Sequence, residues 1–218
     1  MKTRFDHEHF KAVPLVGILR HRGMLDYAGL VEAVLAGGLT TLELSFTHAG
    51  AAIDLAGLVA AAAGRLNLGA GTITTLARLA EARATGASFI VTPMVVAEVV
   101  DACVASGVPI FPGAFTPTEI VAADAMGATM VKLFPAVSLG IAFVAQLKAT
   151  MPELRLLPTG GIGCADIAGW KRAGADGLGL GGGLFPAALL ANRDWAALSA
   201  NIRRHVAAWQ ALLLSSTA

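Results

Sequence analysis

One unit recurs along this chain: an amphipathic, alanine-rich segment, a glycine, and a short apolar segment. The glycine appears in the strings Ala36-Gly37-Gly38, Thr85-Gly86-Ala87, Ser106-Gly107-Val108, Met126-Gly127-Ala128 and Ala173-Gly174-Ala175. A glycine at this place is typical of the left-handed residue that ends a helix before a turn into a strand. The repeat therefore predicts helices that alternate with strands.

Eight strands are expected, all short and with few charges. They are Val13–Arg20, Thr41–Phe46, Leu66–Gly71, Phe89–Thr92, Ile110–Phe111, Met130–Phe134, Leu154–Pro158 and Gly177–Leu180. Eight strand–helix units indicate an α/β protein with a parallel sheet, most simply a (β/α)₈ TIM barrel. An open doubly wound sheet is the alternative, but no Gly-x-Gly-x-x-Gly follows the first strand. We expect one domain over residues 1–218, with residues 1–12 forming a short N-terminal helix or arm.

Composition narrows the class of partner. The chain has 218 residues, a formal net charge of +1 and only 14% charged residues, so nucleic acid is not expected as a partner. The apolar runs are too short for a membrane span, and the polar start favours a cytoplasmic protein. The two cysteines, Cys103 and Cys164, are far apart and outside any CxxC motif, which predicts free thiols. We expect a small-molecule substrate and neither a metal nor a cofactor.

Lys132 is a charged residue inside an apolar predicted strand, Met-Val-Lys-Leu-Phe from position 130 to 134. Burial disfavours an ammonium, lowers its pKa and leaves a nucleophilic amine. Strand alternation places Lys132 on the same face as Phe134, which in a barrel is the interior. The alternative is an ion-paired core lysine.

Glu43 is a second lone charge, in the strand Leu42-Glu43-Leu44-Ser45. Alternation points it into the same interior. A lysine and a glutamate at one barrel mouth suit carbonyl chemistry, because the amine attacks the carbonyl and the carboxyl group moves protons. The alternative is a buried salt bridge, which is a weak device for stability.

Further polar residues and glycines follow the predicted strands. Arg20 and Thr72 could hold a substrate carboxylate, although Arg20 could also be a charge at the rim. The turns Pro158-Thr159-Gly160-Gly161-Ile162 and Gly179 to Gly183 follow the last two strands. Glycine-rich turns at these places in a barrel favour a phosphate pocket, although tight turns also simply use glycine.

Taken together, the motifs resemble the family of 2-keto-3-deoxy-6-phosphogluconate, 2-keto-3-deoxy-6-phosphogalactonate and 4-hydroxy-2-oxoglutarate aldolases. The motifs are Gly17-Ile18-Leu19-Arg20, Leu42-Glu43-Leu44, Gly69-Ala70-Gly71-Thr72, Val91-Thr92-Pro93, Phe111-Pro112-Gly113, Val131-Lys132-Leu133-Phe134-Pro135-Ala136 and Pro158-Thr159-Gly160-Gly161-Ile162. The resemblance implies a metal-free, homotrimeric barrel that splits a 2-keto-4-hydroxy acid into pyruvate and an aldehyde.

The resemblance also assigns roles to residues. Lys132 would form the Schiff base with the C2 carbonyl, and Glu43 would act as general acid and base. Thr72 and Thr159 would contact the pyruvate part. The glycines of the last two turns would bind the phosphate; they are Gly160, Gly161, Gly181 and Gly182.

Two departures from the family pattern concern the substrate. Members specific for phosphogluconate carry Glu-Val-Thr-Leu-Arg-Thr, whose arginine binds the carboxylate, and Thr47 stands at that position here. Arg20, placed as in the galactonate-type members, is the candidate for the missing charge. The last turn commonly carries a serine for the phosphate, and here it is all glycine from 181 to 183.

Two other functions compete with the aldolase. An epimerase or a thiamin-phosphate-type synthase would need a metal cluster or paired acids, and the sequence offers neither set. A ligand-binding barrel of the same fold without turnover is the other alternative, because of Thr47.

Overall fold

The computed structural model describes residues 4–21 and 25–214. Strands and helices alternate along this part of the chain, as the repeat predicts. The strands are β1 (Leu15–Leu19), β2 (Thr41–Ser45), β3 (Asn67–Gly71), β4 (Phe89–Val91), β5 (Ile110–Phe111), β6 (Gly113–Ala114), β7 (Val131–Leu133), β8 (Leu156–Pro158) and β9 (Leu178–Leu180). The helices are α1 (His7–Ala12), α2 (Tyr27–Ala36), α3 (Ala51–Ala62), α4 (Leu76–Ala84), α5 (Ala97–Ala105), α6 (Pro117–Ala125), α7 (Ala136–Leu139), α8 (Ile141–Thr150), the 3₁₀ helix η1 (Cys164–Asp166), α9 (Ile167–Arg172), α10 (Ala187–Ala191) and α11 (Trp195–Leu214).

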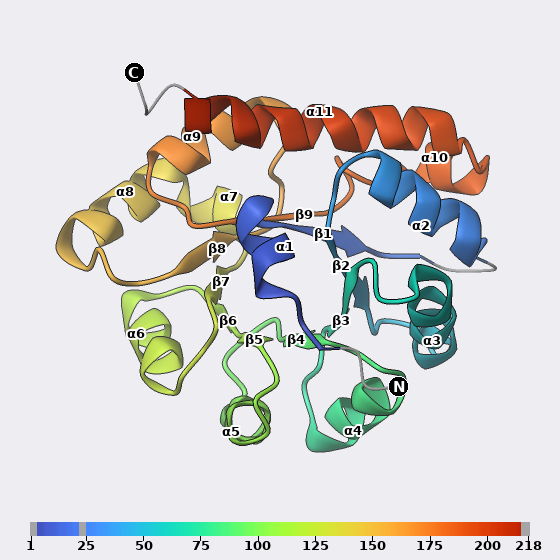
Figure 1. Cartoon of the computed structure of the whole chain (residues 1–218). Helices are drawn as coiled ribbons and strands as arrows, with labels where there is room; N and C mark the ends of the chain where they lie inside the picture. Colours follow the sequence, from blue (N-terminus) through green and yellow to red (C-terminus); the bar gives the residue numbers. More distant parts are fainter. Residues whose placement is uncertain (1–3, 22–24, 215–218) are drawn as a thin grey trace.

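Every strand pairing in the described chain is parallel. Six strands form one sheet in the order β5-β4-β3-β2-β1-β9, and three form another in the order β6-β7-β8. The sheets curl, and most helices lie around their outer side, whereas α1 lies over the middle of the curl (Figure 1). The α/β class with a parallel sheet is thus confirmed.

The fifth predicted strand is correct in position but incomplete. β6 follows β5 after the single residue Pro112, and this strand was not predicted from the sequence. Proline has no N–H to donate to a ladder, so the pairing changes sheets there. Its carbonyl still accepts a hydrogen bond from the Lys132 N–H at 2.8 Å. At the other end of the small sheet, an isolated bridge pairs Thr159 with Gly179.

The helices begin and end where local chemistry favours it. Side chains of Asp6, Asp26, Thr75 and Thr116 accept hydrogen bonds from N–H groups in the first turns of α1, α2, α4 and α6. After α2, α4, α5, α6 and α9 comes a glycine with positive φ, namely Gly38, Gly86, Gly107, Gly127 and Gly174. The prediction from the glycine repeat is therefore confirmed.

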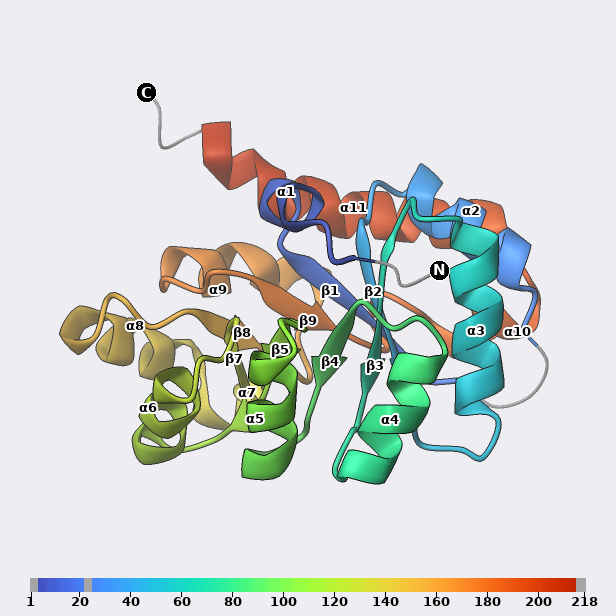
Figure 2. The same cartoon turned by 60° about the horizontal axis from the view of Figure 1, so that its bottom comes forward.

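The helix α1 is the N-terminal helix expected before the first strand, and it lies over the strand beginnings. Phe5 and Phe10 pack with Phe89 of β4 and Phe111 of β5, at ring-centroid distances of 5.6 to 6.3 Å. Asn67, the first residue of β3, bonds to the Asp6 backbone in both directions. This cluster closes the interior at one end, so the carboxyl ends of the strands are the open side. Figure 2 shows α1 above one end of the curled sheet.

Candidate active site

Lys132 lies at the centre of β7, in register with Gly113 of β6 and Leu157 of β8. Its side chain is buried, with 5% of the residue exposed. This burial lowers the pKa of the Lys132 amine; the Glu43 charge raises it, and the Arg20 charge lowers it further. A desolvated lysine of this kind holds more of its amine in the neutral, nucleophilic form at neutral pH.

Glu43 lies in β2, between Ile18 of β1 and Gly69 of β3 in the register, and only 2% of it is exposed. Its carboxyl group fills the space beside Gly71, where a Cβ atom would overlap it. Any larger residue at position 71 would therefore displace the glutamate. Within the described part of the chain, no ion pair joins Glu43 to Lys132, and the two interact over a longer distance. The salt-bridge alternative is therefore wrong.

Phe134 follows Lys132 on the same face of the strand. The Lys132 Nζ lies 5.2 Å from the centre of the Phe134 ring. The half-buried ring also borders Gly160, whose Cβ position would be 3.2 Å from it. Phe134 therefore lies between the lysine and the first glycine-rich turn, and the expected shared face is confirmed.

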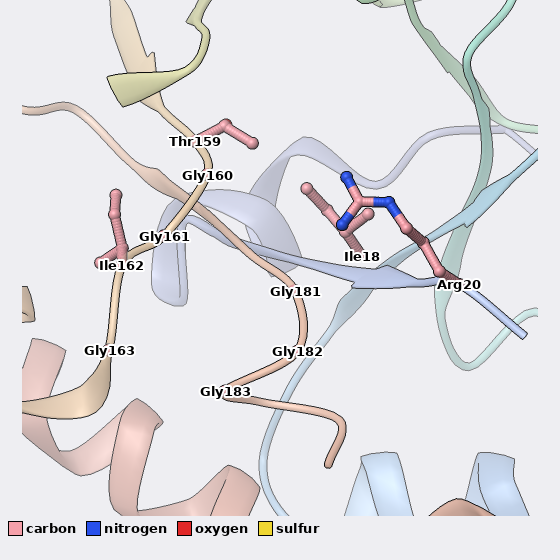
Figure 3. Close-up of a pocket in the computed structure, with 10 residues that line it drawn as sticks. All are labelled: Ile18, Arg20, Thr159, Gly160, Gly161, Ile162, Gly163, Gly181, Gly182 and Gly183. Carbon is pink, nitrogen blue, oxygen red and sulfur yellow. The ribbon is translucent and has the colours of Figure 1, made fainter. Parts of the chain in front are cut away.

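The two glycine-rich turns meet in one pocket of ≈ 290 Å³. Its lining comprises Ile18, Arg20, Thr159, Gly160, Gly161, Ile162, Gly163, Gly181, Gly182 and Gly183 (Figure 3). The Arg20 side chain extends from the end of β1 toward the Thr159 side of this pocket (Figure 3). A Cβ atom on Gly181 would lie 3.3 Å from an Arg20 guanidinium nitrogen. Backbone N–H groups and a guanidinium around one cavity are suited to an anion.

Thr159 is almost fully buried beside this pocket, with 1% exposed. Its hydroxyl donates to the Leu157 carbonyl at 3.0 Å, and its side chain fills the space above Gly179. The hydroxyl is thereby fixed at the boundary between the interior and the glycine turns.

Thr72 lies on the other side of the opening, directly after β3. Its hydroxyl is 2.9 Å from the Ser45 hydroxyl of β2. Its φ is 64°, in the left-handed region that β-branched residues rarely adopt. Thr72 is not among the residues that line the pocket with Arg20, and the expectation that the two hold one carboxylate stays a prediction.

Thr47 is exposed and lines a second pocket, of ≈ 360 Å³. The other lining residues are Phe46, His48, Ala49, Ala51, Arg78 and Glu81. His48 bonds to Asp54 at 2.8 Å, and Asp54 also accepts from the Tyr27 hydroxyl at 2.9 Å. His48 therefore ties the loop to the helices α2 and α3. Arg78 was not predicted from the sequence, because an arginine on an amphipathic helix carries no signal of a special role.

Two general features of the described residues bear on the class of site. No group of three or more His, Cys, Asp or Glu side chains there could hold a metal ion. No helix there is both long and apolar enough to cross a membrane.

Comparisons with known proteins agree with this geometry. The family model for KDPG and KHG aldolase matches residues 7–201. The 2-dehydro-3-deoxy-phosphogluconate aldolase of Treponema pallidum (strain Nichols) is 36% identical over 162 residues, 74% of this chain and 75% of the relative. The 2-dehydro-3-deoxy-6-phosphogalactonate aldolase of Escherichia coli (strain K12) is 30% identical, over 80% of this chain and 86% of the relative.

A solved structure shows the likeness in three dimensions. It is a KDPG aldolase from Legionella pneumophila, with pyruvate captured at low pH as a covalent carbinolamine intermediate. It is 26% identical with a TM-score of 0.81, covering 89% of this chain and 95% of that one. The fold, the buried lysine and these matches define a class I aldolase, an enzyme that is a carbon–carbon lyase. The chain belongs to the KDPG and KHG aldolase family.

Proposed function

We propose that this aldolase reversibly cleaves a 2-keto-3-deoxy-6-phospho sugar acid, or 4-hydroxy-2-oxoglutarate, to pyruvate and an aldehyde. The aldehyde is glyceraldehyde 3-phosphate from the sugar acid and glyoxylate from 4-hydroxy-2-oxoglutarate. The observation that carries the proposal is Lys132, a buried lysine of lowered pKa at the centre of β7.

In the proposed mechanism, the neutral Lys132 amine attacks the C2 carbonyl and forms a carbinolamine. Loss of water gives a protonated imine. The C3–C4 bond then breaks as the 4-hydroxyl group loses its proton, which releases the aldehyde and leaves an enamine on Lys132. Protonation of the enamine at C3 restores the imine, and water releases pyruvate and the free lysine.

Glu43 is the proposed general acid and base for these steps. Its carboxyl group is buried, and its charge influences the amine of Lys132. It can donate a proton to the departing C2 hydroxyl and take one from the 4-hydroxyl, directly or through a water molecule.

The remaining site residues bind different parts of the proposed substrate. Thr72, Thr159 and Phe134 surround the pyruvate part, and Thr47 lies at its outer edge. Gly160, Gly161, Gly181 and Gly182 bind the phosphate through their backbone N–H groups, with Arg20 as the counter-charge. An all-glycine turn offers backbone donors where a serine hydroxyl is absent, so we propose a phosphorylated sugar acid as the preferred substrate.

We also propose that the two sheets are parts of one eight-stranded (β/α)₈ barrel in a single domain over residues 1–218. β5 and β6 are separated only by Pro112, and the Thr159–Gly179 bridge connects β8 to β9. Residues 1–3, 22–24 and 215–218 of this proposed domain lie outside the described residues. These two connections would join both edges of the small sheet to the large one.

The proposed assembly is a homotrimer in the cytoplasm. Exposed apolar side chains, including Met94 at 57% and Phe115 at 40%, offer surface for contacts between subunits. A charged sugar-acid phosphate does not cross membranes, which supports a cytoplasmic enzyme. Light scattering on the protein as it elutes from a size-exclusion column would measure the number of subunits directly.

Borohydride reduction of the protein in the presence of pyruvate tests the proposed function. Intact mass and peptide mapping should find one reduced pyruvate adduct, on Lys132. A folded protein without an adduct, or with the adduct on another lysine, would contradict the assignment of Lys132. Cleavage of a panel of phosphorylated sugar acids and 4-hydroxy-2-oxoglutarate would then identify the aldehyde part.

A further inference from the structure

Arg78 of α4 connects the ends of two strands at the open side of the sheet. Its Nη1 atom donates to the Phe46 carbonyl at 2.9 Å and lies 3.4 Å from the Thr72 carbonyl. The register between β2 and β3 ends at the pair Ser45 and Gly71. Arg78 thus adds a side-chain connection just beyond the last pair of the ladder.

This connection reaches a residue that needs support. Thr72 has a φ of 64°, a conformation that is unfavourable for a β-branched residue and persists where the surroundings enforce it. Two contacts enforce it here: Ser45 holds the hydroxyl at 2.9 Å, and Arg78 holds the carbonyl. The direction of the Thr72 hydroxyl therefore depends on both ends of the residue being held.

The shape of the proposed substrate indicates why the orientation of Thr72 matters for binding. With C2 at Lys132 and the phosphate in the glycine-lined pocket, the carboxylate on C2 must point away from that pocket. The opposite side of the opening carries the hydroxyls of Ser45 and Thr72. Arg20 lines the pocket formed by the two glycine-rich turns, which we call the glycine-lined pocket. Arg78 lies beside Thr47 in the second pocket, on the side of Ser45 and Thr72, which we call the hydroxyl side.

We propose that Arg78 is a positioning residue for the binding of the 2-keto acid carboxylate. It acts through Thr72: by holding the Thr72 carbonyl, it keeps the left-handed backbone and aims the Thr72 hydroxyl at the carboxylate. This inference rests on the proposed function, since it assumes that a 2-keto acid reacts at Lys132. It assigns a role in substrate binding to a helix residue.

The test uses pyruvate alone, so it does not depend on which aldehyde the enzyme accepts. An enzyme that converts pyruvate to an enamine exchanges its methyl protons with deuterium, which proton NMR follows as a function of pyruvate concentration. Arg78→Gln should raise the KM for exchange about tenfold, the equivalent of one charge-assisted hydrogen bond, and leave kcat within about twofold. Arg78→Lys, which keeps the charge without the planar fork, should raise the KM about threefold.

Arg83→Gln is the matched control. Arg83 is an arginine of the same helix, and it donates to Ser106 at 3.0 Å instead of to a strand end. It should leave both KM and kcat unchanged. Thermal melts establish that each variant is folded, and Arg78→Lys carries the test if Arg78→Gln does not fold.

A double-mutant cycle tests the route through Thr72. In a Thr72→Ala background, Arg78→Gln should change the KM by less than about twofold, because no hydroxyl remains to be positioned. Effects that simply multiply would overturn this route, as would an unchanged KM in folded Arg78→Gln. A wild-type enzyme that exchanges no pyruvate protons overturns the proposed function and this inference together. Exchange in the wild type with an unchanged KM in both Arg78 variants overturns the inference alone.

Discussion

Different chemical groups line the two sides of the active-site opening. On the β8 and β9 side, six glycines from two turns line a pocket together with the Arg20 guanidinium. On the β2 and β3 side, the hydroxyl groups of Ser45 and Thr72 bond to each other, and Arg78 donates to the carbonyl groups of Phe46 and Thr72. Backbone donors are fixed by the course of the turn, whereas hydroxyl groups depend on the residues that orient them.

This difference suggests how one scaffold serves the whole substrate. Backbone N–H groups bind an anion of high charge without needing a particular side chain. A planar keto acid needs donors that are placed by angle as well as by distance. We therefore expect substitutions on the glycine side to change the discrimination between phosphorylated and unphosphorylated substrates. Substitutions on the hydroxyl side should change the affinity for pyruvate itself.

The largest effect should come from Lys132, because both sides of the opening bind the substrate that reacts with it. Lys132→Met removes the nucleophile while roughly preserving the volume of the side chain, so the fold should persist. We expect proton exchange and cleavage to fall at least about a thousandfold, as measured by NMR and pyruvate release. A folded Lys132→Met enzyme with substantial activity would show that the imine forms elsewhere.

The next largest effect should come from the glycine side. A Cβ atom at Gly161, where φ is 77°, would meet Val137 Cγ2 at 2.7 Å. Gly161→Ala should therefore shift the turn and lower kcat/KM for phosphorylated sugar acids by roughly ten- to a hundredfold. Pyruvate exchange should stay within about twofold of the wild type, which would separate the two sides.

Gly64→Ala is a suitable control for Gly161→Ala. Gly64 has a φ of 82°, and a Cβ atom there would meet nothing within 4 Å. It introduces the same backbone strain far from the glycine-lined pocket. If it reduces kcat/KM as much as Gly161→Ala does, the loss reflects stability and not the phosphate site.

Arg20 should give a smaller effect of the same kind. Arg20→Gln removes the charge from the glycine-lined pocket, so we expect about a tenfold loss of kcat/KM for phosphorylated substrates. The KM for pyruvate exchange should change by less than about twofold. A large rise in that KM would instead place the carboxylate at Arg20, as the position of the residue at the end of the first strand suggested.

Most of the fold was predictable because its signals are local. Each helix that ends at a glycine and each apolar strand is visible in a short stretch of sequence. β6 was missed because a two-residue strand after a proline has no periodicity to detect. β6 pairs with β7, and the helix α6 separates these two strands in the sequence.

The site residues were predictable where a charged residue occurs within an apolar strand. Lys132 and Glu43 are single charges in apolar strands, and both lie buried in the interior. Arg78 gave no such signal, because it bonds to backbone groups of other segments, and the left-handed backbone of Thr72 gave none either. The side of the opening that Arg20 faces was also not readable, since β1 has a neighbour on each side.

The smallest effect should come from Thr47, which borders the hydroxyl side. Thr47 is exposed beside Arg78 in the pocket of ≈ 360 Å³, so an arginine can be accommodated there. Thr47→Arg should lower the KM for pyruvate exchange about threefold, because a second guanidinium joins the carboxylate side while the charge of Arg78 opposes it. In the Arg78→Gln background that opposition is gone, so Thr47→Arg should lower the KM by a larger factor. Equal factors in both backgrounds would mean that the two positions act on different parts of the substrate.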